Sequence, residues 1–413
     1  MKILAVDNSP AMGGSVHHLA AQIRVLSESG ARFRLIASNP DLFAGSLPPD
    51  VPVRTLSWPG FRDVFRHTGA LADPVLPGPL NRPFSFLAYR RLASILVPEF
   101  LRVLDEDPPD LVHINNLNLP NKVFGDALAA RGMRFTLAAQ MIRLFGRTEA
   151  AFAAQSARVV CVSRAVRECL TRQMPNVTPD RYAIAENGID PARYAVPRER
   201  SILAELGVPP DARVVLSLAR LIEWKGHDVL ARAMGSVPDA WLVQAGGEES
   251  RVWRERVQAI ARDAGAGDRF VVAGIRADVP RLLGAADVLA HSSKYDRAEQ
   301  GVVEAFGRVI VEAMAAGVPV VATDVGGAAE IFRHDDGTPW THDGVAPGRL
   351  VPAGNSDAMA DAIRHYLEHP DDARRAGEAG RVRAWDYDER VTAKKLAEVF
   401  DTVAGEGARA TNS

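Results

Sequence analysis

Two glutamates, Glu304 and Glu312, lie eight residues apart in the stretch EAFGRVIVEAMAAGVPVVAT, which ends at Thr323. The small residues after Glu312 and the Gly-Val-Pro that follows them predict a helix that begins near Gly307 or Arg308. A helix N-terminus carries unpaired N–H groups and a partial positive charge, so it holds phosphate and other anions well. Glu312 would lie on the second turn, roughly 6 to 8 Å along the axis, and Glu304 would lie ahead of the helix.

This layout predicts the kind of ligand that the two carboxylates would bind. Carboxylates accept hydrogen bonds from vicinal hydroxyl groups. A ligand with a diphosphate in the middle and a hydroxyl-rich ring at each end would place one ring near each carboxylate and the diphosphate at the helix start. A nucleotide-sugar has this arrangement, so the pattern predicts a nucleotide-sugar site.

A second stretch, SLARLIEWKGHDVL, places Arg220 and Lys225 five residues apart on a turn after a predicted strand. Two cations there would neutralise a departing diphosphate, because arginine grips oxygens bidentately and lysine acts as a mobile point charge. They would supply the charge stabilisation that a metal gives in other enzymes. The sequence shows no His, Cys or Asp cluster with metal-ligand spacing, so we expect no metal and no cofactor beside the nucleotide-sugar co-substrate.

Composition limits the class of protein and its compartment. A chain of 413 residues suits two domains, and 49 basic against 51 acidic side chains exclude a strongly electrostatic nucleic-acid binder. Cys161 and Cys169 form no CxxC pair and are expected to be buried and inert, which favours a reducing cytoplasm. The opening MKILAVDNSP resembles a short strand rather than a secretory leader, and no apolar run of about 18 residues occurs, so we expect no spanning helix.

Apolar runs bounded by turn signals alternate with helical periods along the whole chain. The predicted strands are KILAVD, RFRLIAS, DLVHIN, RFTLAA and RVVCVS in the first half, and RVVLSLAR, AWLVQAG, RFVVAG, DVLAHS and VPVVATD in the second. Buried strands separated by helices predict an α/β fold with parallel sheets covered on both faces. The turn-rich stretch 183–200 marks the junction, and we expect two Rossmann-like domains at 1–185 and 186–384 that face a central cleft.

The segment Phe61–Leu92 combines five arginines with five aromatic residues and only two aspartates. One interpretation is a basic and aromatic face that contacts anionic lipid at the inner membrane surface or a charged acceptor. The other, which we favour, is a long surface loop that leads into an amphipathic helix. Peripheral membrane contact therefore stays open.

The motifs RLIEWKG, ENGID and EAFGRVIVEAMAAGVPVVATDVGG, in this order, resemble the retaining GT-B glycosyltransferases of family 4. The resemblance covers most of the chain and is strongest between residues 183 and 331. It implies two Rossmann-like domains, with residues 385–413 forming a helix that crosses back to the first domain and a frayed tail. It implies a metal-independent transferase that moves a sugar from a nucleotide-sugar to a hydroxyl acceptor in glycan, glycolipid or glycoconjugate biosynthesis. The sugar would keep its configuration, and the departing phosphate would take the acceptor proton.

The resemblance also implies a role for each matched residue of the C-terminal half. Glu304 would bind hydroxyls of the donor sugar, Glu312 the nucleotide ribose, and Arg220 with Lys225 the diphosphate. The remaining donor-binding positions would be the helix-start amides of Gly307, Arg308 and Val309, the base-side residues Ile275 and Arg276, and Gly13 and Gly14 in the loop of the first domain that faces the diphosphate. The first domain would bind the acceptor.

Two departures from the family pattern affect the acceptor side and the sugar pocket. Many relatives carry His-x-His where this chain reads LVHINNLNLP, with His113 followed by Asn115. We expect Asn115 or Asn116 to face the sugar and His113 to be structural, although His113 stays a catalytic candidate. The stretch KYDRAEQGVV adds Arg297 and Glu299 near the sugar pocket, either to select a donor or as a plain insertion.

A further motif, DVGGAAE, contains Gly326, Gly327 and Glu330. We interpret it as a turn and a helix start, and a role near the phosphates is the alternative.

Two other functions remain open at the level of the sequence. One is another enzyme of this fold, such as a nucleotide-sugar epimerase or a phosphorylase. The other is a non-catalytic partner subunit that binds a nucleotide-sugar without turning it over. Hydrolysis of candidate donors separates the subunit from an enzyme.

Overall fold

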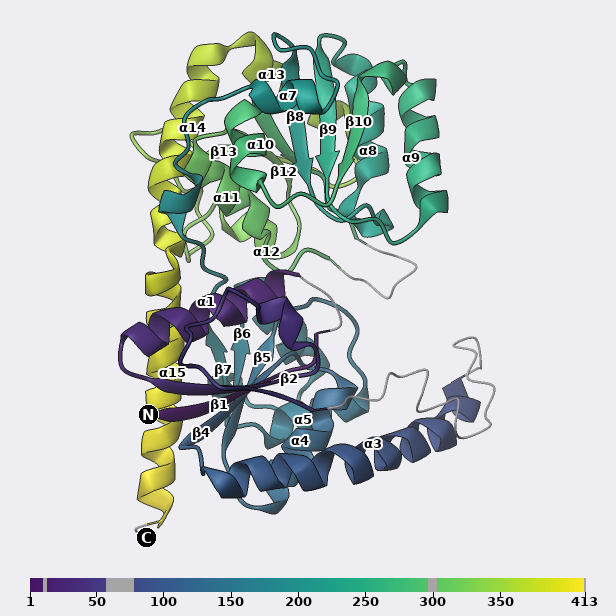
Figure 1. The fold of residues 1–413 in the computed structure, drawn as a ribbon. Helices are drawn as coiled ribbons and strands as arrows, with labels where there is room; N and C mark the ends of the chain where they lie inside the picture. The colour runs from purple at the N-terminus through teal and green to yellow at the C-terminus, as the bar shows by residue number, and fades with distance from the viewer. Residues whose placement is uncertain (10–12, 57–77, 296–302, 412–413) are drawn as a thin grey trace.

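The computed structural model describes residues 1–9, 13–56, 78–295 and 303–411 of the chain. It contains two parallel sheets, one of seven strands in the order β3-β2-β1-β4-β5-β6-β7 and one of six in the order β10-β9-β8-β11-β12-β13. Figure 1 shows the sheets in two separate lobes with helices on both faces of each. The expected pair of doubly wound α/β domains is therefore confirmed.

The first sheet and its helices occupy the N-terminal half of the chain. The strands are β1 (Lys2–Asp7), β2 (Arg32–Ala37), β3 (Val53–Thr55), β4 (Leu111–Asn115), β5 (Phe135–Ala139), β6 (Arg158–Cys161) and β7 (Tyr182–Ile184). The helices are α1 (Gly14–Glu28), α3 (Gly78–Glu106), α4 (Leu119–Ala130), α5 (Arg147–Gln155) and α6 (Arg164–Gln173), with short 3-10 turns η1 (Pro40–Phe43), η2 (Pro179–Arg181) and η3 (Pro191–Tyr194).

The second sheet and its helices follow. The strands are β8 (Arg213–Leu218), β9 (Ala240–Ala245), β10 (Phe270–Gly274), β11 (Val288–His291), β12 (Val320–Thr323) and β13 (Gly348–Val351). The helices are α7 (Ser201–Glu205), α8 (His227–Ala233), α9 (Arg251–Asp263), α10 (Val279–Ala285), α11 (Arg308–Ala316), α12 (Gly326–Glu330), α13 (Ser356–Glu368), α14 (Pro370–Ala384) and α15 (Glu389–Thr411), with 3-10 turns η4 (Glu223–Lys225), η5 (Met234–Ser236), η6 (Gly267–Arg269) and η7 (Trp385–Tyr387).

Every strand predicted from the sequence is present, and three strands were missed. The missed strands β3, β7 and β13 each lie at an edge of a sheet and have only three or four residues. All three residues of β3 are exposed, and Arg349 of β13 is exposed as well. Strands this short carry no apolar run long enough to stand out, whereas the central strands are buried on both faces and do.

The carboxyl ends of the central strands meet at one edge of each sheet, and this edge positions the candidate site. In the first sheet, Asp7 at the end of β1 pairs in register with Asn115 at the end of β4. The first sheet ends with β7 and the second begins with β8, so we propose 1–185 and 186–384 as the domain bounds. Ligands of open α/β sheets bind at this carboxyl edge.

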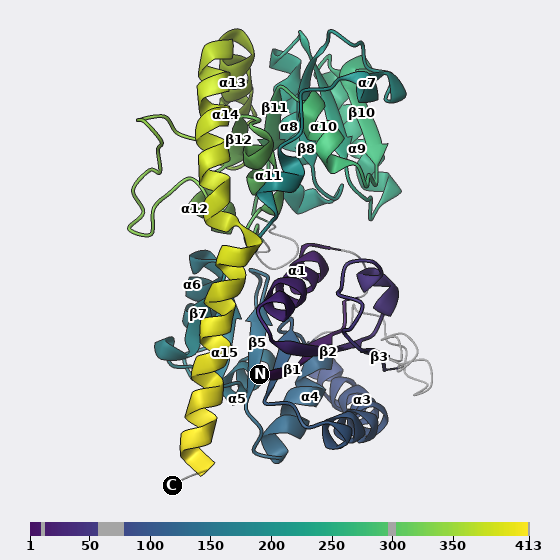
Figure 2. The ribbon, with the colours of Figure 1, turned by 60° about the vertical axis from the view of Figure 1, so that its left-hand side comes forward.

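The last helix returns to the first domain, as the resemblance implied. Figures 1 and 2 show α14 along the second domain and α15, in yellow, along the first. Within α15, Phe400 is fully buried and meets the His113 ring of β4 edge-on at 5.2 Å. Helix α15 continues to Thr411, and Glu406 pairs with Arg158 at 2.5 Å and with Arg134, which holds this part of the helix on the first sheet.

The segment Phe61–Leu92 is described only in part, because residues 61–77 lie outside the described residues. Helix α3 begins at Gly78, as the favoured interpretation of a loop leading into a helix requires. Its buried face, in the described side chains, runs from Leu92 through Leu96 to Phe100. Within the described part of the chain, none of the helices combines the length and the apolar character that a membrane span needs. Cys161 and Cys169 are buried free thiols, as expected.

We expect Phe400→Ala to lower the free energy of unfolding by about 3 to 5 kcal/mol, because it leaves a cavity between α15 and β4. The exposed residue Lys394 of the same helix supplies the control, since Lys394→Ala removes no core contact. Urea unfolding measures both variants. Equal stability of the two variants would show that α15 does not dock on the first sheet through Phe400.

Candidate functional site

One cavity of about 640 Å³ lies where the carboxyl edges of the two sheets face each other. Its walls come from both domains. The first domain contributes Asn8, Ser9, Gly13, Gly14, Ser15, Asn116, Leu117, Asn118, Ala139, Gln140, Met141, Ile142, Arg143 and Phe145; the second contributes Leu218, Ala219, Arg220, Trp224, Lys225, Val303, Glu304, Ala305, Phe306, Gly307, Arg308 and Val309, and Asn187 lies between them. The structure thus brings together most of the predicted donor-binding residues.

Two helix N-termini from different domains open onto this cavity. Helix α1 begins after Gly13, whose backbone is extended, and α11 begins after Gly307, whose φ of 91° is in the left-handed region. Neither of these N-cap residues makes a side-chain cap hydrogen bond. A Cβ added at Gly14 would lie 3.8 Å from Cδ of Arg308, so the two helix starts are close neighbours. Their free amides and partial positive charges make this part of the cavity an anion site.

Glu304 precedes α11, as predicted, and its carboxylate is buried among polar partners. It forms an ion pair with Nζ of Lys225. It also contacts Nε2 of His291 at 3.0 Å and Oγ of Ser293 at 3.4 Å. Burial raises the pKa of Glu304, but the Lys225 charge and the His291 hydrogen bond outweigh burial and hold the pKa well below its ordinary value. The carboxylate is therefore ionised and serves as a hydrogen-bond acceptor.

The turn that carries the two predicted cations is docked on the end of β11. Oγ of Ser292 donates to the Lys225 carbonyl at 2.9 Å, and Gly226 packs directly on the backbone of Ser292. The Lys225 ammonium lies 4.2 Å from the centre of the Trp224 ring. Arg220 lines the cavity, but its guanidinium pairs with Glu249 and is 55% exposed. Lys225 is thus already at the site, whereas Arg220 points toward solvent.

Glu312 lies on the second turn of α11, as predicted, but it does not line the same cavity as Glu304. It is buried and pairs with Nη2 of Arg308 at 3.3 Å. Burial and the neighbouring Glu312 carboxylate raise the pKa of Tyr194, whose hydroxyl hydrogen-bonds to Glu312. Nε and Nη1 of Arg308 are buried without a hydrogen-bond partner among the described residues. Arg308 therefore covers Glu312 in the free chain and is only loosely held there.

The first domain contributes a polar floor to the cavity, which includes Ser9, Asn116 and Gln140. Below it, Asp7 accepts from Nδ2 of Asn115 at 2.6 Å, from the amide of Ser9 at 2.9 Å and from Oγ of Ser9 at 3.0 Å. Asn115 in turn accepts from Gln140. Burial raises the pKa of Asp7 more than these hydrogen bonds lower it. The buried carboxylate fixes Ser9 and, through Asn115, Gln140, both of which line the cavity.

The structure places the two N-terminal catalytic candidates away from the cavity. His113 is 2% exposed, bonds through Nδ1 to Oγ1 of Thr136 at 2.8 Å and packs on Phe400. Burial lowers the pKa of His113 to about 4, so it is neutral. Asn115 is 1% exposed and turned toward Asp7. Asn116, with a φ of 87°, lines the cavity in its place.

The two predicted base-side residues lie at the end of β10, beyond the cavity walls. Ile275 is 85% exposed and lies next to Gly247. Arg276 pairs with Asp278 at 2.6 Å and with Glu205 at 3.4 Å. Arg297 and Glu299 lie outside the described residues.

Sequence reasoning missed two residues of the site, His291 and Trp224. His291 ends β11 in the segment HSS, and its position at a strand end was the only signal that pointed to it. Trp224 stands inside the motif RLIEWKG next to Lys225. Among the described residues, no group of three or more His, Cys, Asp or Glu side chains is arranged to hold a metal ion.

Comparison with known families agrees with the site and the fold. Residues 12–193 match the model of Glycosyltransferase Family 4, and residues 199–383 match the model of Glycosyl transferases group 1. Together the two matches take in nearly all of both sheets. The chain belongs to the group 1, family 4 glycosyltransferases of the GT-B type.

Several characterised relatives share about a third of their aligned residues with this chain. The alpha-maltose-1-phosphate synthase of Mycolicibacterium smegmatis is 32% identical over 245 residues, which cover 54% of this chain and 57% of the relative. A GDP-mannose-dependent alpha-(1-6)-phosphatidylinositol monomannoside mannosyltransferase of Mycobacterium tuberculosis is 34% identical over 233 residues, 54% of each chain. The matched region thus spans little more than half the length of these relatives.

Solved structures extend the likeness of fold to almost the whole chain. A glycosyltransferase from Rickettsia africae superposes with a TM-score of 0.75 at 18% identity, over 97% of this chain and 98% of its own. Anabaena HepE in complex with UDP-glucose superposes with a TM-score of 0.75 at 23% identity, over 97% of this chain and 100% of its own. At these identities the likeness concerns the fold.

We expect Glu304→Gln to lower the free energy of unfolding at neutral pH by a few kcal/mol, because it leaves the Lys225 ammonium without a charged partner in a largely buried setting. The pKa of Glu304 is lower in the folded chain than its ordinary value of 4.5. The stabilisation by the carboxylate is therefore fully present above about pH 4.5 and is lost as the pH falls through the folded pKa.

Urea unfolding of the wild type and the variant between neutral pH and about pH 3 measures this difference. The gap in stability should be constant above pH 5 or so and should narrow in acid. The assigned ionisation of Glu304 would be contradicted if the difference in unfolding free energy stayed constant down to about pH 3, or if it appeared only at acid pH.

Proposed function

We propose that the protein transfers a sugar from a nucleotide-sugar donor to a hydroxyl group of an acceptor, with the donor on the second domain and the acceptor on the first. The observation that carries this proposal is the ionised, buried Glu304 carboxylate beside Lys225, in a cavity where two helix N-termini converge. The relatives support it, because one is named as GDP-mannose-dependent and HepE was solved with UDP-glucose.

The diphosphate of the donor would lie between the starts of α1 and α11. The amides of Gly14, Arg308 and Val309 line the cavity there and point to a shared anion site. Lys225 is within reach of both this anion and the Glu304 carboxylate, so it supplies preorganised positive charge as the leaving group departs. Arg220 would leave its exposed pair with Glu249 to join it. This charge needs no metal ion, and we propose a metal-independent reaction.

The sugar of the donor would lie against Glu304. An ionised carboxylate accepts two hydrogen bonds from vicinal hydroxyls, and the pair with Lys225 and the contact with His291 keep Glu304 ionised for this task. A neutral Glu304 would accept fewer hydrogen bonds from the sugar hydroxyls. The low pKa of Glu304 is thus a requirement for donor binding.

The nucleoside would lie at the other end of the diphosphate. We propose that the bound diphosphate draws the guanidinium of Arg308 away from Glu312, which frees that carboxylate for the ribose hydroxyls. The exposed side chain of Ile275 at the end of β10 offers an apolar surface to the base. The identity of the base is left to experiment.

The acceptor would lie on the polar floor, with Asn116, Ser9 and Gln140 as its partners. The asparagine amide cannot take a proton at neutral pH, and His113 is not in the cavity. We therefore propose that the departing phosphate oxygen takes the proton of the attacking hydroxyl on the same face of the sugar, which retains the configuration. The products would serve glycan, glycolipid or glycoconjugate biosynthesis in the cytoplasm.

A non-catalytic nucleotide-sugar-binding subunit is the second candidate. One observation favours it, namely that His113, the histidine candidate of the first domain, is buried away from the cavity. Such a subunit would keep the donor site and lack turnover.

A thermal-shift screen with UDP-, GDP-, ADP- and dTDP-sugars, followed by measurement of nucleotide release, separates the two candidates. We expect one donor class to raise the melting temperature and to be consumed in the presence of a hydroxyl acceptor. Stabilisation without nucleotide release would favour the binding subunit, and no stabilisation by any donor would refute both.

We expect Glu304→Ala and Lys225→Ala each to reduce turnover at least about a hundredfold, because each removes preorganised charge from the reacting centre. The exposed Arg251 of α9, paired with Glu255, supplies a control whose loss should leave the rate unchanged. Steady-state nucleotide release measures all three variants. Near-normal rates in both site variants would refute these assignments.

A further inference from the structure

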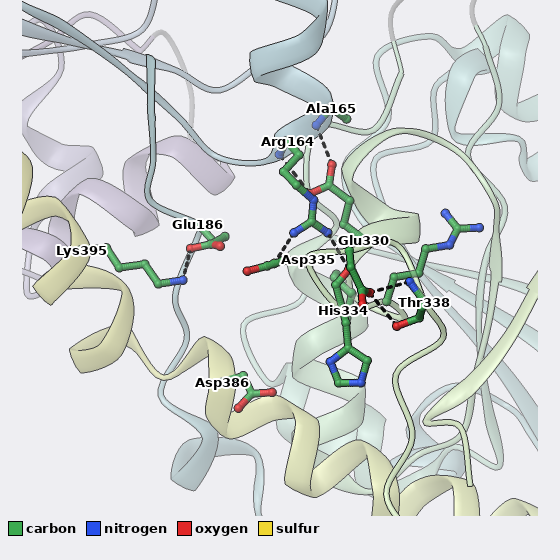
Figure 3. Close-up of polar contacts among 12 residues, drawn as sticks. Arg164, Ala165, Glu186, Glu330, His334, Asp335, Thr338, Asp386 and Lys395 are labelled. Atoms are coloured by element: carbon green, nitrogen blue, oxygen red, sulfur yellow. Dashed lines mark hydrogen bonds and ion pairs between the residues drawn. The ribbon is translucent and has the colours of Figure 1, made fainter. Parts of the chain in front are cut away.

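The motif DVGGAAE forms a contact between the two domains that the proposed reaction does not use. Its helix α12 belongs to the second domain, and its last residue, Glu330, extends to the start of α6 in the first domain (Figure 3). One carboxylate oxygen of Glu330 accepts from the amide of Arg164 at 3.0 Å and the other accepts from the amide of Ala165 at 2.5 Å. The carboxylate thus binds both amides that begin α6.

The cap of α6 is shared between the domains. Ser163, the N-cap residue of α6, accepts from the third amide, that of Val166, at 3.1 Å. The first two amides, those of Arg164 and Ala165, find their hydrogen-bond acceptor in Glu330 of the other domain. The helix dipole also favours an acidic group at this end of a helix. Separation of the domains would leave those two donors to water. Glu330 therefore stabilises the start of α6 and, in doing so, holds the two domains together.

The other end of α12 rests on the residue that the proposed reaction depends on. The amide of Gly327 donates to the Glu304 carbonyl at 2.9 Å. A Cβ at Gly326 would collide with that same carbonyl, and a Cβ at Gly327 would collide with the carbonyl of Ala305 and lie 2.9 Å from Oγ of Ser163. The two glycines allow this approach. Helix α12 is thus a short rigid link between the backbone of Glu304 and the first domain.

The link is anchored within its own domain by Arg383 of α14. The guanidinium of Arg383 donates to the carbonyls of Ile331 at 2.8 Å and Arg333 at 2.9 Å, directly after α12. Arg164 adds an outer contact, because it pairs with Asp335, which is 98% exposed. Figure 3 shows Asp335 beside Arg164 at the edge of the contact. The amide cap lies inside, and the ion pair with Asp335 faces solvent.

We propose that Glu330 is an interdomain positioning residue, which holds the cleft closed by capping α6 and couples closure to the position of Glu304 through α12. Burial raises the pKa of Glu330 more than its two backbone hydrogen bonds and Arg164 lower it, so closure desolvates a carboxylate. A contact of this kind suits a cleft that must open to release product. The coupling to catalysis rests on the proposed function, whereas the role in closure does not.

Small-angle X-ray scattering and amide hydrogen exchange of the full chain test the closure. In Glu330→Ala we expect a larger radius of gyration and about tenfold faster exchange of the amides at 164–165, in line with the loss of a helix cap. The matched control is Asp335→Ala, which removes only the exposed partner of Arg164. It should change neither the radius of gyration nor the exchange rate of the amides at 164–165. Wild-type values in Glu330→Ala, or equal changes in the control, would overturn the proposal.

A second pair of variants separates the contribution of the Arg164 backbone amide from that of its side chain. Arg164→Pro removes the amide donor at the first position of α6, where proline is tolerated after the extended Ser163, and Arg164→Ala removes only the guanidinium. Arg164→Pro should open the cleft more than Arg164→Ala in the wild-type background, and the two should be equal in the Glu330→Ala background. An unchanged difference in both backgrounds would refute the cap.

Turnover provides a separate reading. With a donor from the screen, Glu330→Ala should lower kcat severalfold while stabilisation by the nucleoside diphosphate of that donor persists in part, because the second domain would still bind the nucleoside. If no donor is turned over even by the wild type, the proposed function fails, and scattering and exchange still decide whether Glu330 closes the cleft. If Glu330→Ala kept the wild-type kcat while scattering showed an opened cleft, the proposed coupling between closure and Glu304 would be refuted.

Discussion

Two positive helix ends, one from each domain, open onto the cavity at the domain boundary. A Cβ at Gly14, the first residue of α1, would touch the side chain of Arg308, the first residue of α11, and neither N-cap residue makes a side-chain cap hydrogen bond. Like partial charges repel, so an anion between the two helix starts would add to the contacts that hold the domains together. An anion that binds both helix starts favours the closed chain by its differential affinity for it. We propose that the same feature binds the diphosphate and favours closure.

The surroundings of Glu304 show how several distant segments fix one carboxylate. Lys225 comes from the turn after β8, His291 from the end of β11, and the glycines of α12 hold its backbone. The ion pair with Lys225 offsets the cost of burying the charge. On the first domain, Asp7 plays a comparable part without a cation, since amide and hydroxyl donors alone hold it. The second domain brings the Glu304–Lys225 pair to the cavity, whereas the first domain lines it mostly with neutral groups, which fits a charged donor and a hydroxyl acceptor.

The sequence predicted the central strands and the start of α11 because local signals determine them. Apolar runs identify buried strands, and a glycine before a run of small residues identifies the start of a helix. The sequence could not predict which side chain of the LVHINN segment reaches the cavity. His113 is held by Phe400 from the far end of the chain, Asn115 is held by Asp7, and Asn116 reaches the cavity through a positive φ. None of these contacts leaves a trace in the local pattern.

The covering of Glu312 and the interdomain cap were missed for the same reason. The spacing of Glu304 and Glu312 fixes their places along α11, but it does not show that Arg308 folds over Glu312. The acidic residue of DVGGAAE looks like an ordinary end of a helix until the first domain is placed beside it. Long-range packing decides both, and a single sequence carries little information about it.

A crystal structure of the chain with the nucleotide-sugar that stabilises it most tests the central claim directly. The account predicts that phosphate oxygens lie about 3 Å from amide nitrogens at the starts of both α1 and α11, with sugar hydroxyls on Glu304. A donor bound elsewhere, or a diphosphate that contacts neither helix start, would contradict it.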